Sequence, residues 1–218
     1  MLIRWGLLVL IVTTILLFVQ TTSVGQIQEE QTIQMSGIHI EERVYKEVSQ
    51  KEERITDIAD KYNAEPEYLI YIVELEKEFN LKPYSLLSVI AAESGFKPQT
   101  KMDVGSLSYN TTQMKMHSAK TAYMAMTKYF DLDVEYPTDE LLRNDKYYAT
   151  YLAAGYLKYL NAIYKDDDYY ETYTAYNWGI PGRMIYYNRH GNFKSPYAMK
   201  VEELQKSFEE YIEGEGGN

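Results

Sequence analysis

The sequence Leu86-Leu87-Ser88-Val89-Ile90-Ala91-Ala92-Glu93-Ser94-Gly95-Phe96-Lys97-Pro98 is the most informative stretch of this 218-residue chain. We predict a helix over residues 83–93, because proline is favoured in the first turn of a helix and glycine, here Gly95, directly after its end. Apolar residues three to seven positions before Glu93 share its face of the helix, namely Leu86, Val89 and Ile90. Glu93 is therefore expected to emerge from an apolar stripe in the last turn.

Two physical effects are expected to raise the pKa of Glu93. The unpaired carbonyl groups at a helix C-terminus carry partial negative charge, and an apolar surrounding removes water, so both disfavour an ionised carboxyl group. A glutamic acid that keeps its proton near neutral pH is the donor that cleavage of a glycosidic bond requires. Glu93 is thus a candidate catalytic acid, although a glutamate at a helix end is more commonly a solvated surface residue.

The rest of the chain has a helical pattern with one polar interruption. Residues 97–110 are rich in Gly, Ser and Asp, and are expected to form a loop or short hairpin directly after the Glu93 helix. Strands and helices do not alternate, so the sequence predicts a mainly α domain with a short polar loop or small β-hairpin. Further helices are expected over residues 66–79, 111–130, 139–164, 168–178 and 195–212.

The first 25 residues have the features of an export signal. Arg4 gives a positive start, an apolar run over residues 5–19 is shorter than the ~20 residues of a typical membrane helix, and Ser23-Val24-Gly25 offers a cleavage site. We predict a signal peptide over residues 1–25, or else an uncleaved membrane anchor through residues 5–19. The remainder is expected to be extracytoplasmic, at the cell wall or outer face of the membrane. It would comprise an acidic, partly helical stalk (26–64), the helical domain (65–213) and a flexible tail (214–218).

Composition and charge exclude several classes of protein. The chain contains no cysteine, so disulfide bonds and thiolate nucleophiles are excluded. The formal net charge is -10, most of it in residues 26–80, and the lysines do not cluster into the basic face that nucleic acid binding needs. His39, His117 and His190 are scattered without ligand spacing, so neither a metal site nor a cofactor is expected.

A second motif, Thr174-Ala175-Tyr176-Asn177-Trp178-Gly179-Ile180-Pro181-Gly182-Arg183, combines aromatic and amide side chains. Rings cover the apolar face of a sugar and amides bond its polar groups, whereas Asn and Gly before a proline more commonly form a helix C-cap and turn. Three motifs follow one another along the chain: the Glu93-Ser94-Gly95-Phe96 segment before Pro98, then Gly155 followed by Tyr159-Leu160, and then this motif. In this order they resemble the catalytic domain of the soluble lytic transglycosylase family. The resemblance covers residues 81–192.

This resemblance implies a lysozyme-like α fold and cleavage of peptidoglycan glycan strands. Glu93 would be the single catalytic acid/base, protonating the oxygen between N-acetylmuramic acid and N-acetylglucosamine and leaving a 1,6-anhydro end. The implied substrate site consists of Ser94, Gln113, Tyr176 and Asn177. Tyr176 would orient Glu93, Asn177 and Gln113 would hold the substrate, and Ser94 would support the loop beside the acid. No cofactor or metal is implied.

One motif departs from the family pattern. Where the family has Gly-Leu-Met-Gln, this chain has Asn110-Thr111-Thr112-Gln113, in which only the glutamine agrees. This departure leaves open a non-catalytic wall-binding or scaffold protein. A second alternative is a goose-type lysozyme-like hydrolase of the same bond, in which Asp103 would position water. Asp103 also has a structural interpretation, as a turn residue before Gly105.

Overall fold

The computed structural model describes residues 46–103 and 105–214. Residues 51–214 belong to one compact unit, whereas residues 46–50, which are helical and exposed, belong to a separate N-terminal unit. The expected signal or anchor, residues 26–45 of the expected stalk and residues 215–218 of the expected tail lie outside the described residues. Over the part of the chain that is described, no helix is long and apolar enough to cross a membrane.

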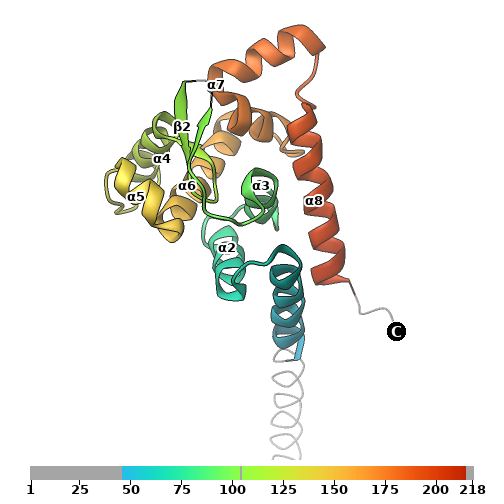
Figure 1. Ribbon diagram of the computed structural model, residues 1–218. Helices are drawn as coiled ribbons and strands as arrows, with labels where there is room; N and C mark the ends of the chain where they lie inside the picture. Colours follow the sequence, from blue (N-terminus) through green and yellow to red (C-terminus); the bar gives the residue numbers. More distant parts are fainter. Residues whose placement is uncertain (1–45, 104, 215–218) are drawn as a thin grey trace, which may run out of the picture. The chain divides into compact units, whose positions relative to one another are not determined.

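The compact unit consists of helices and one small sheet (Figure 1). A helix over residues 51–62 comes first. It is followed by α2 (Pro66–Glu78), α3 (Ser85–Ser94), β1 (Lys101–Asp103), β2 (Ser106–Tyr109), β3 (Met114–Lys115), α4 (Met116–Tyr129), α5 (Asp139–Asn144), α6 (Lys146–Tyr164), α7 (Tyr170–His190) and α8 (Pro196–Glu213). The prediction of a mainly α, lysozyme-like domain is confirmed, and the polar segment after α3 forms an antiparallel sheet in the order β1-β2-β3.

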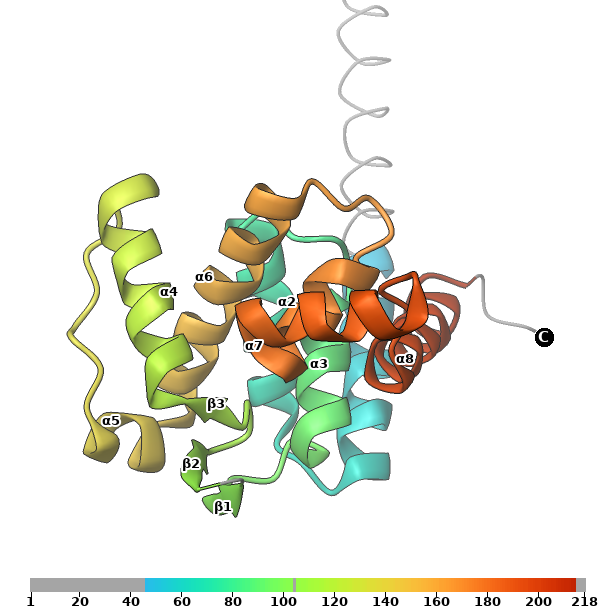
Figure 2. The ribbon, with the colours of Figure 1, turned by 90° about the horizontal axis from the view of Figure 1, so that it is seen from above.

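Helix α3 lies at the centre of the compact unit (Figure 2). It packs against α2, α6 and α8, and four of its apolar side chains have no exposed surface, namely Leu86, Leu87, Val89 and Ile90. Full burial of such a side chain contributes about 1.5–3 kcal/mol to stability. The helix that carries Glu93 is therefore held as a fixed element of the core.

A buried carboxyl group fixes the first turn of α3. Glu76 of α2 accepts hydrogen bonds from the backbone N–H groups of Tyr84, at 2.7 Å, and Leu87, at 2.9 Å, which a helix start otherwise leaves unpaired. Tyr84 has a left-handed conformation, with φ 60°, so α3 begins at Ser85 and not at Pro83 as predicted. Burial raises the pKa of Glu76 to about 8, against the opposing effect of the N–H donors.

The packing of α4 on α6 depends on a glycine. A Cβ atom at Gly155 of α6 would lie 2.3 Å from Sδ and 2.6 Å from Cγ of Met126 in α4, far inside the ~3.5–4.0 Å of a normal contact. Met126 is fully buried, so its side chain has little space into which to move. The glycine of the predicted Gly-x-x-x-Tyr-Leu segment therefore allows the two helices to approach.

The helices predicted over residues 111–130 and 139–164 also differ from the observed ones. Helix α4 begins at Met116 rather than at residue 111, because Asn110 and Gln113 have left-handed conformations, with φ 58° and 48°, and the next two residues form β3. The helix predicted over residues 139–164 is divided into α5 and α6 by Asp145, with φ -113° and ψ 101°. The Asp145 carboxylate caps α6 by accepting from the N–H of Tyr148 at 2.9 Å, a favoured role for aspartate.

Helix α7 bends where the sequence predicts its end. Gly179 has φ 75° and ψ 162°, after which the chain resumes a helical course to His190. This conformation favours glycine, and Pro181 directly afterwards has no N–H that needs a partner. Arg183 in the second half forms an ion pair with Glu171 in the first half, at 3.3 Å. The ion pair thus links the two halves of α7 across the bend, and Asn177 and Trp178, directly before the bend, are exposed.

Candidate active site

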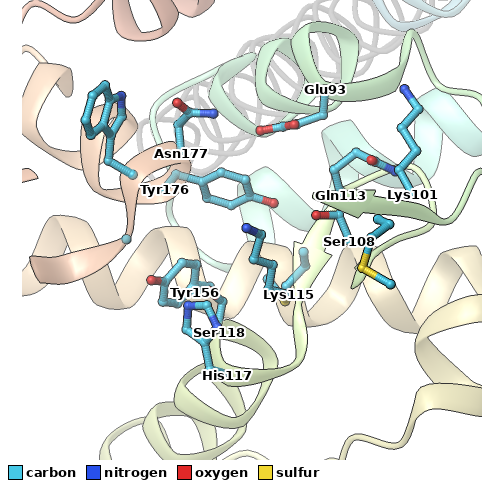
Figure 3. Close-up of a pocket in the computed structure, with 14 residues that line it drawn as sticks. Glu93, Lys101, Ser108, Gln113, Lys115, His117, Ser118, Tyr156, Tyr176 and Asn177 are labelled. Atoms are coloured by element: carbon cyan, nitrogen blue, oxygen red, sulfur yellow. The ribbon is translucent and has the colours of Figure 1, made fainter. Parts of the chain in front are cut away.

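The end of α3 opens into a pocket of about 420 Å³. Glu93 lies in its wall, and the other lining residues come from the sheet, the start of α4, α6 and the bend in α7. Figure 3 shows Gln113, Tyr176 and Asn177 around the same space as Glu93. Four of the five residues that the sequence singles out therefore meet at one pocket, although they are distant along the chain.

Ser94, the fifth of these residues, lies beside the pocket rather than among its described lining residues. Its hydroxyl group donates a hydrogen bond to the backbone carbonyl of Thr111 at 2.7 Å. This bond joins the last residue of α3 to the turn over residues 110–113. The bond therefore fixes the turn against the end of the helix that carries Glu93.

The turn over residues 110–113 is held by its own polar side chains. Asn110 Nδ2 donates to the carbonyl groups of Leu142 and Arg143, each at 3.1 Å. Thr111 Oγ1 lies 2.5 Å from the hydroxyl of Tyr68. Because these groups are buried or partly buried, their hydrogen bonds remove the cost of placing polar side chains in the interior.

Gln113 is oriented by two backbone carbonyl groups. Its Nε2 donates to the carbonyl of Asn110 at 2.6 Å and to that of Gln99 at 2.8 Å. An amide nitrogen carries two hydrogens, so both are used. The side-chain oxygen is then the atom of Gln113 that can accept a hydrogen bond from a ligand in the pocket.

Tyr176 joins the pocket to the turn. Its hydroxyl donates to the carbonyl of Thr112 at 3.1 Å, and its ring packs against that of Tyr156 with centroids 5.8 Å apart. Burial raises the pKa of Tyr176 well above its ordinary value, and the charge of nearby Glu93 raises it further. The hydroxyl group therefore stays protonated beside the acid, with a backbone carbonyl as its acceptor.

A second tyrosine, which the sequence analysis does not single out, also lies near Glu93. Tyr197 is in the first turn of α8 and its hydroxyl oxygen is buried. Burial raises the pKa of Tyr197 well above its ordinary value, and Glu93 raises it further by its charge and as a hydrogen-bond acceptor. Among the described residues no acceptor meets standard hydrogen-bond geometry for this hydroxyl. The Tyr197 hydroxyl is thus a buried donor next to the Glu93 carboxyl group.

The start of α8 is tied to the end of α3, which explains why Tyr197 is there. Ser195 caps α8 by accepting from the N–H of Ala198 at 3.1 Å. Lys200 Nζ donates to the carbonyl of Ala92, the residue before Glu93, at 3.0 Å. The sequence predicts the helix start at Ser195 correctly, but nothing local shows which side chain of its first turn meets α3.

The sheet side of the pocket is basic. Lys101 and Lys115 line it together with Ser108, and Trp178, which is 45% exposed, lines the pocket at the bend of α7. Among the described residues there is no group of three or more His, Cys, Asp or Glu side chains that could hold a metal ion. The arrangement thus combines one acid, amide and hydroxyl groups, aromatic rings and two lysines.

Asp103, which a hydrolase would use to position water, ends β1 and is paired in register with Ser106 of β2. Its side chain lies outside the part of the structure that is described. The backbone of Asp103 is next to Met102, which lines the pocket. The role of Asp103 stays a prediction.

Comparison with known proteins assigns the family. A family model described as Transglycosylase SLT domain matches residues 70–195, more than half of the chain. A search of curated proteins and a search of solved structures each found no match. The matched segment begins inside α2 and ends at the cap of α8, so it includes every element that lines the pocket. The chain belongs to the Transglycosylase SLT domain family of glycan-cleaving enzymes, whose substrate is peptidoglycan.

Proposed function

We propose that this protein is a lytic transglycosylase that breaks the β-1,4 bond between N-acetylmuramic acid and N-acetylglucosamine. The main support is the placement of Glu93 at the end of a buried helix, in a pocket that it shares with Gln113, Tyr176 and Asn177. Glu93 is the only carboxylic acid among the lining residues whose side chains are described. Most glycosidases need a pair of carboxyl groups, whereas a lytic transglycosylase needs one.

In the proposed reaction Glu93 acts first as an acid and then as a base. Its proton passes to the bridging oxygen, the bond from that oxygen to the anomeric carbon of muramic acid breaks, and the N-acetylglucosamine side leaves with a free 4-hydroxyl group. The Glu93 carboxylate then takes the proton of the muramic acid 6-hydroxyl, whose oxygen bonds to the anomeric carbon. The second product carries a 1,6-anhydro ring, no water is consumed, and Glu93 regains its proton.

The neighbouring side chains have complementary parts in this proposal. The Asn177 amide and the Gln113 side-chain oxygen would bond the N-acetyl and hydroxyl groups of the glycan. The exposed ring of Trp178 would cover the apolar face of a sugar at the edge of the pocket. Tyr176 and Tyr197, both protonated, would surround the carboxyl group with buried hydroxyls, which limits the approach of water to Glu93.

Digestion of purified peptidoglycan tests the proposal. The wild-type protein is expected to release muropeptides whose mass is lower by one water than that of the hydrolysed products. Glu93→Gln should lower the rate about 10²- to 10⁴-fold, since it removes the transferable proton. Glu74→Gln is a matched control, because Glu74 is exposed on α2 and should behave as wild type.

Other outcomes of this experiment would point to the alternatives. Products that have gained a water would support a goose-type lysozyme-like hydrolase with Asp103 as its second carboxylate. Binding to the wall without cleavage, equal in wild type and Glu93→Gln, would support a wall-binding or scaffold protein. Either result would refute the lytic transglycosylase reaction.

We also propose that the protein acts outside the cytoplasm. The support is its family's substrate, which is the cell wall, together with the signal-like sequence of residues 1–25. Fractionation of cells that express the full chain or a chain without residues 1–25 provides the test. The full chain should be found at the membrane, the wall or in the medium, and the shortened chain in the cytoplasm.

A further inference from the structure

Trp178 is a second departure of this chain from the family pattern. Where the pattern has Ala-Tyr-Asn-Ala-Gly, residues 175–179 are Ala-Tyr-Asn-Trp-Gly, so an indole ring replaces a methyl group. Trp178 lines the pocket that contains Glu93 and is 45% exposed. A ring of this size offers a broad apolar face to a ligand, which an alanine cannot do. The departure therefore adds surface to the pocket.

The side chain of Trp178 packs on the second half of α7, residues 180–190. Its ring meets that of Tyr186 edge-on, with centroids 5.6 Å apart. Tyr186 is buried, and its hydroxyl donates to the carbonyl of Lys194 at 3.1 Å. A Cβ atom added at Gly182 would lie 3.0 Å from the Cβ of Trp178, whereas residues four apart in a straight helix have Cβ atoms about 5–6 Å apart. The place of Trp178 thus depends on where the second half of α7 lies.

Side-chain contacts hold that second half against the rest of the domain. Helical geometry is broken at Gly179, and Pro181 has no N–H with which to bond across the break. Arg183 instead forms an ion pair with Glu171 at 3.3 Å. Its guanidinium carbon also lies 4.2 Å from the ring centroid of Tyr164 in α6. One side chain therefore joins the two halves of α7 to each other and to α6.

The ion pair is mostly shielded from water. The side chains of Arg183 and Glu171 are 17% and 20% exposed, so their attraction is screened less than that of a pair on the surface. Burial raises the pKa of Glu171, and the charge of Arg183 opposes this effect. Among the described residues, Nε and Nη1 of Arg183 have no hydrogen-bond partner in standard geometry. The contact is therefore held by charge, and loss of either charge should release the second half of α7.

We propose that Trp178 forms an added subsite for one neutral sugar ring of the glycan, and that Arg183 is the positioning residue that keeps Trp178 in place. This inference rests on the proposed function, in which a glycan strand lies in the pocket. Trp178 stacks on the apolar face of the sugar, so the subsite recognises the ring by contact and not by charge. Arg183 does not touch the sugar, and its effect on binding passes through Trp178.

Binding of chitotetraose, a neutral oligomer of N-acetylglucosamine, tests the subsite without depending on cleavage. The parent is the full chain with Glu93→Gln, which prevents turnover, and Trp5→Phe, which leaves Trp178 as the only tryptophan. Titration calorimetry measures the affinity, and quenching by acrylamide measures how far Trp178 is covered. Bound ligand should protect Trp178 from the quencher. Trp178→Ala should lower the affinity about 3- to 10-fold, the range of one aromatic stacking contact.

A double-mutant cycle tests the positioning role. Arg183→Met should lower the affinity as much as Trp178→Ala does, and saturating ligand should no longer protect Trp178 from acrylamide. In a chain that already carries Trp178→Ala, Arg183→Met should have no further effect, because residues that act through one contact are not additive. Arg189→Met is the matched control and should bind as the parent does. Arg189 is an exposed cation on the same half of α7 and is not among the described lining residues.

A milder variant covers the case in which Arg183→Met lowers the melting temperature. Glu171→Gln then takes its place in the cycle, since it removes one charge of the pair and keeps the shape of the side chain. It should lower the affinity in the parent and leave the affinity unchanged in the Trp178→Ala chain. A general loosening of the fold would instead weaken binding in both chains, and so would refute the positioning role.

The remaining outcomes separate the subsite, the positioning role and the reaction. Unchanged affinity in Trp178→Ala, or no binding of millimolar chitotetraose by the parent, would refute the subsite. Unchanged affinity in both Arg183→Met and Glu171→Gln would refute the positioning role. The proposed reaction is judged from the products of the wild-type chain. Hydrolysed products would refute the reaction and leave the Trp178 subsite in place.

Discussion

Replacement of Tyr197 by phenylalanine is expected to slow catalysis without lowering stability. The substitution removes one hydroxyl group, whose oxygen is buried near Glu93 without a described acceptor in standard geometry. Hydrogen bonds around catalytic groups are often long in a ligand-free protein and shorten when the substrate is bound. We therefore expect the Tyr197 hydroxyl to hold the Glu93 carboxylate during the reaction and to contribute little to folding.

The size of both effects follows from the environment of the hydroxyl. A hydrogen bond to a charged group is worth about 1.5–3 kcal/mol, so kcat should fall about 10- to 100-fold. A buried hydroxyl without a good partner costs about 1–3 kcal/mol, and its removal relieves part of that cost. For a domain of this size 1 kcal/mol corresponds to about 2–4 °C. The melting temperature of Tyr197→Phe should be unchanged or a few degrees higher.

Tyr176→Phe is the matched comparison, because the Tyr176 hydroxyl has a partner. It donates to the carbonyl of Thr112 at 3.1 Å, and its removal leaves that carbonyl without this donor. The cost of an unsatisfied buried group is about 1–3 kcal/mol, so the melting temperature should fall by several degrees. Both variants are measured for release of anhydro ends and for thermal unfolding. Wild-type kcat in Tyr197→Phe, or a loss of stability as large as in Tyr176→Phe, would show that our assignment of Tyr197 is wrong.

Three more predictions concern other positions. Asp103→Asn should keep more than about a tenth of wild-type activity, since loss of a general base costs about 10²-fold or more; a loss as deep as in Glu93→Gln would favour hydrolysis. Gly155→Ala should lower the free energy of unfolding by about 1–3 kcal/mol through a clash with Met126, and urea unfolding should show no such penalty when Met126→Ala is already present. The pKa of Glu76 is raised from 4.5 to about 8 on folding, so between these pH values the folded protein holds a proton that the unfolded chain has released. Stability should then fall by about 1.4 kcal/mol per pH unit as the pH rises from ~5 to ~8, and urea unfolding of Glu76→Gln should lack this slope; equal slopes in both chains would contradict it.

The helices could be predicted wherever their signals are local. Helix α2 begins at Pro66 and α8 follows the Ser195 cap, as the apolar spacing and the cap residues indicate. The break at Asp145 is harder to predict, because the apolar pattern continues across it. At Asp145 a capping bond to the next helix outweighs a continuous helix. At Gly179 the chain bends and resumes, where a helix end was expected.

The pocket could be predicted only in part, for a related reason. Glu93, Gln113, Tyr176 and Asn177 were found from ordered motifs, and the structure brings them together. Lys101 and Lys115 line the same pocket only because three short strands pair in this register, and short polar strands give no pattern that fixes a register. Tyr197 reaches Glu93 through the packing of α8 on α3, which is a tertiary contact without a sequence signal.

The altered turn over residues 110–113 changes the contacts inside the domain more than it changes the lining of the pocket. Of its four residues only Gln113, the one that agrees with the family pattern, is among the described residues that line the pocket. Asn110 bonds the carbonyls of Leu142 and Arg143 at the end of α5, and Thr111 bonds Tyr68 of α2. Polar side chains with these partners stand where the family pattern has a glycine and two apolar residues, and they leave the Gln113 amide fixed by backbone carbonyls. This arrangement supports the proposal of an active enzyme, because the departure keeps Gln113 at the pocket and satisfies the polar groups that face the core.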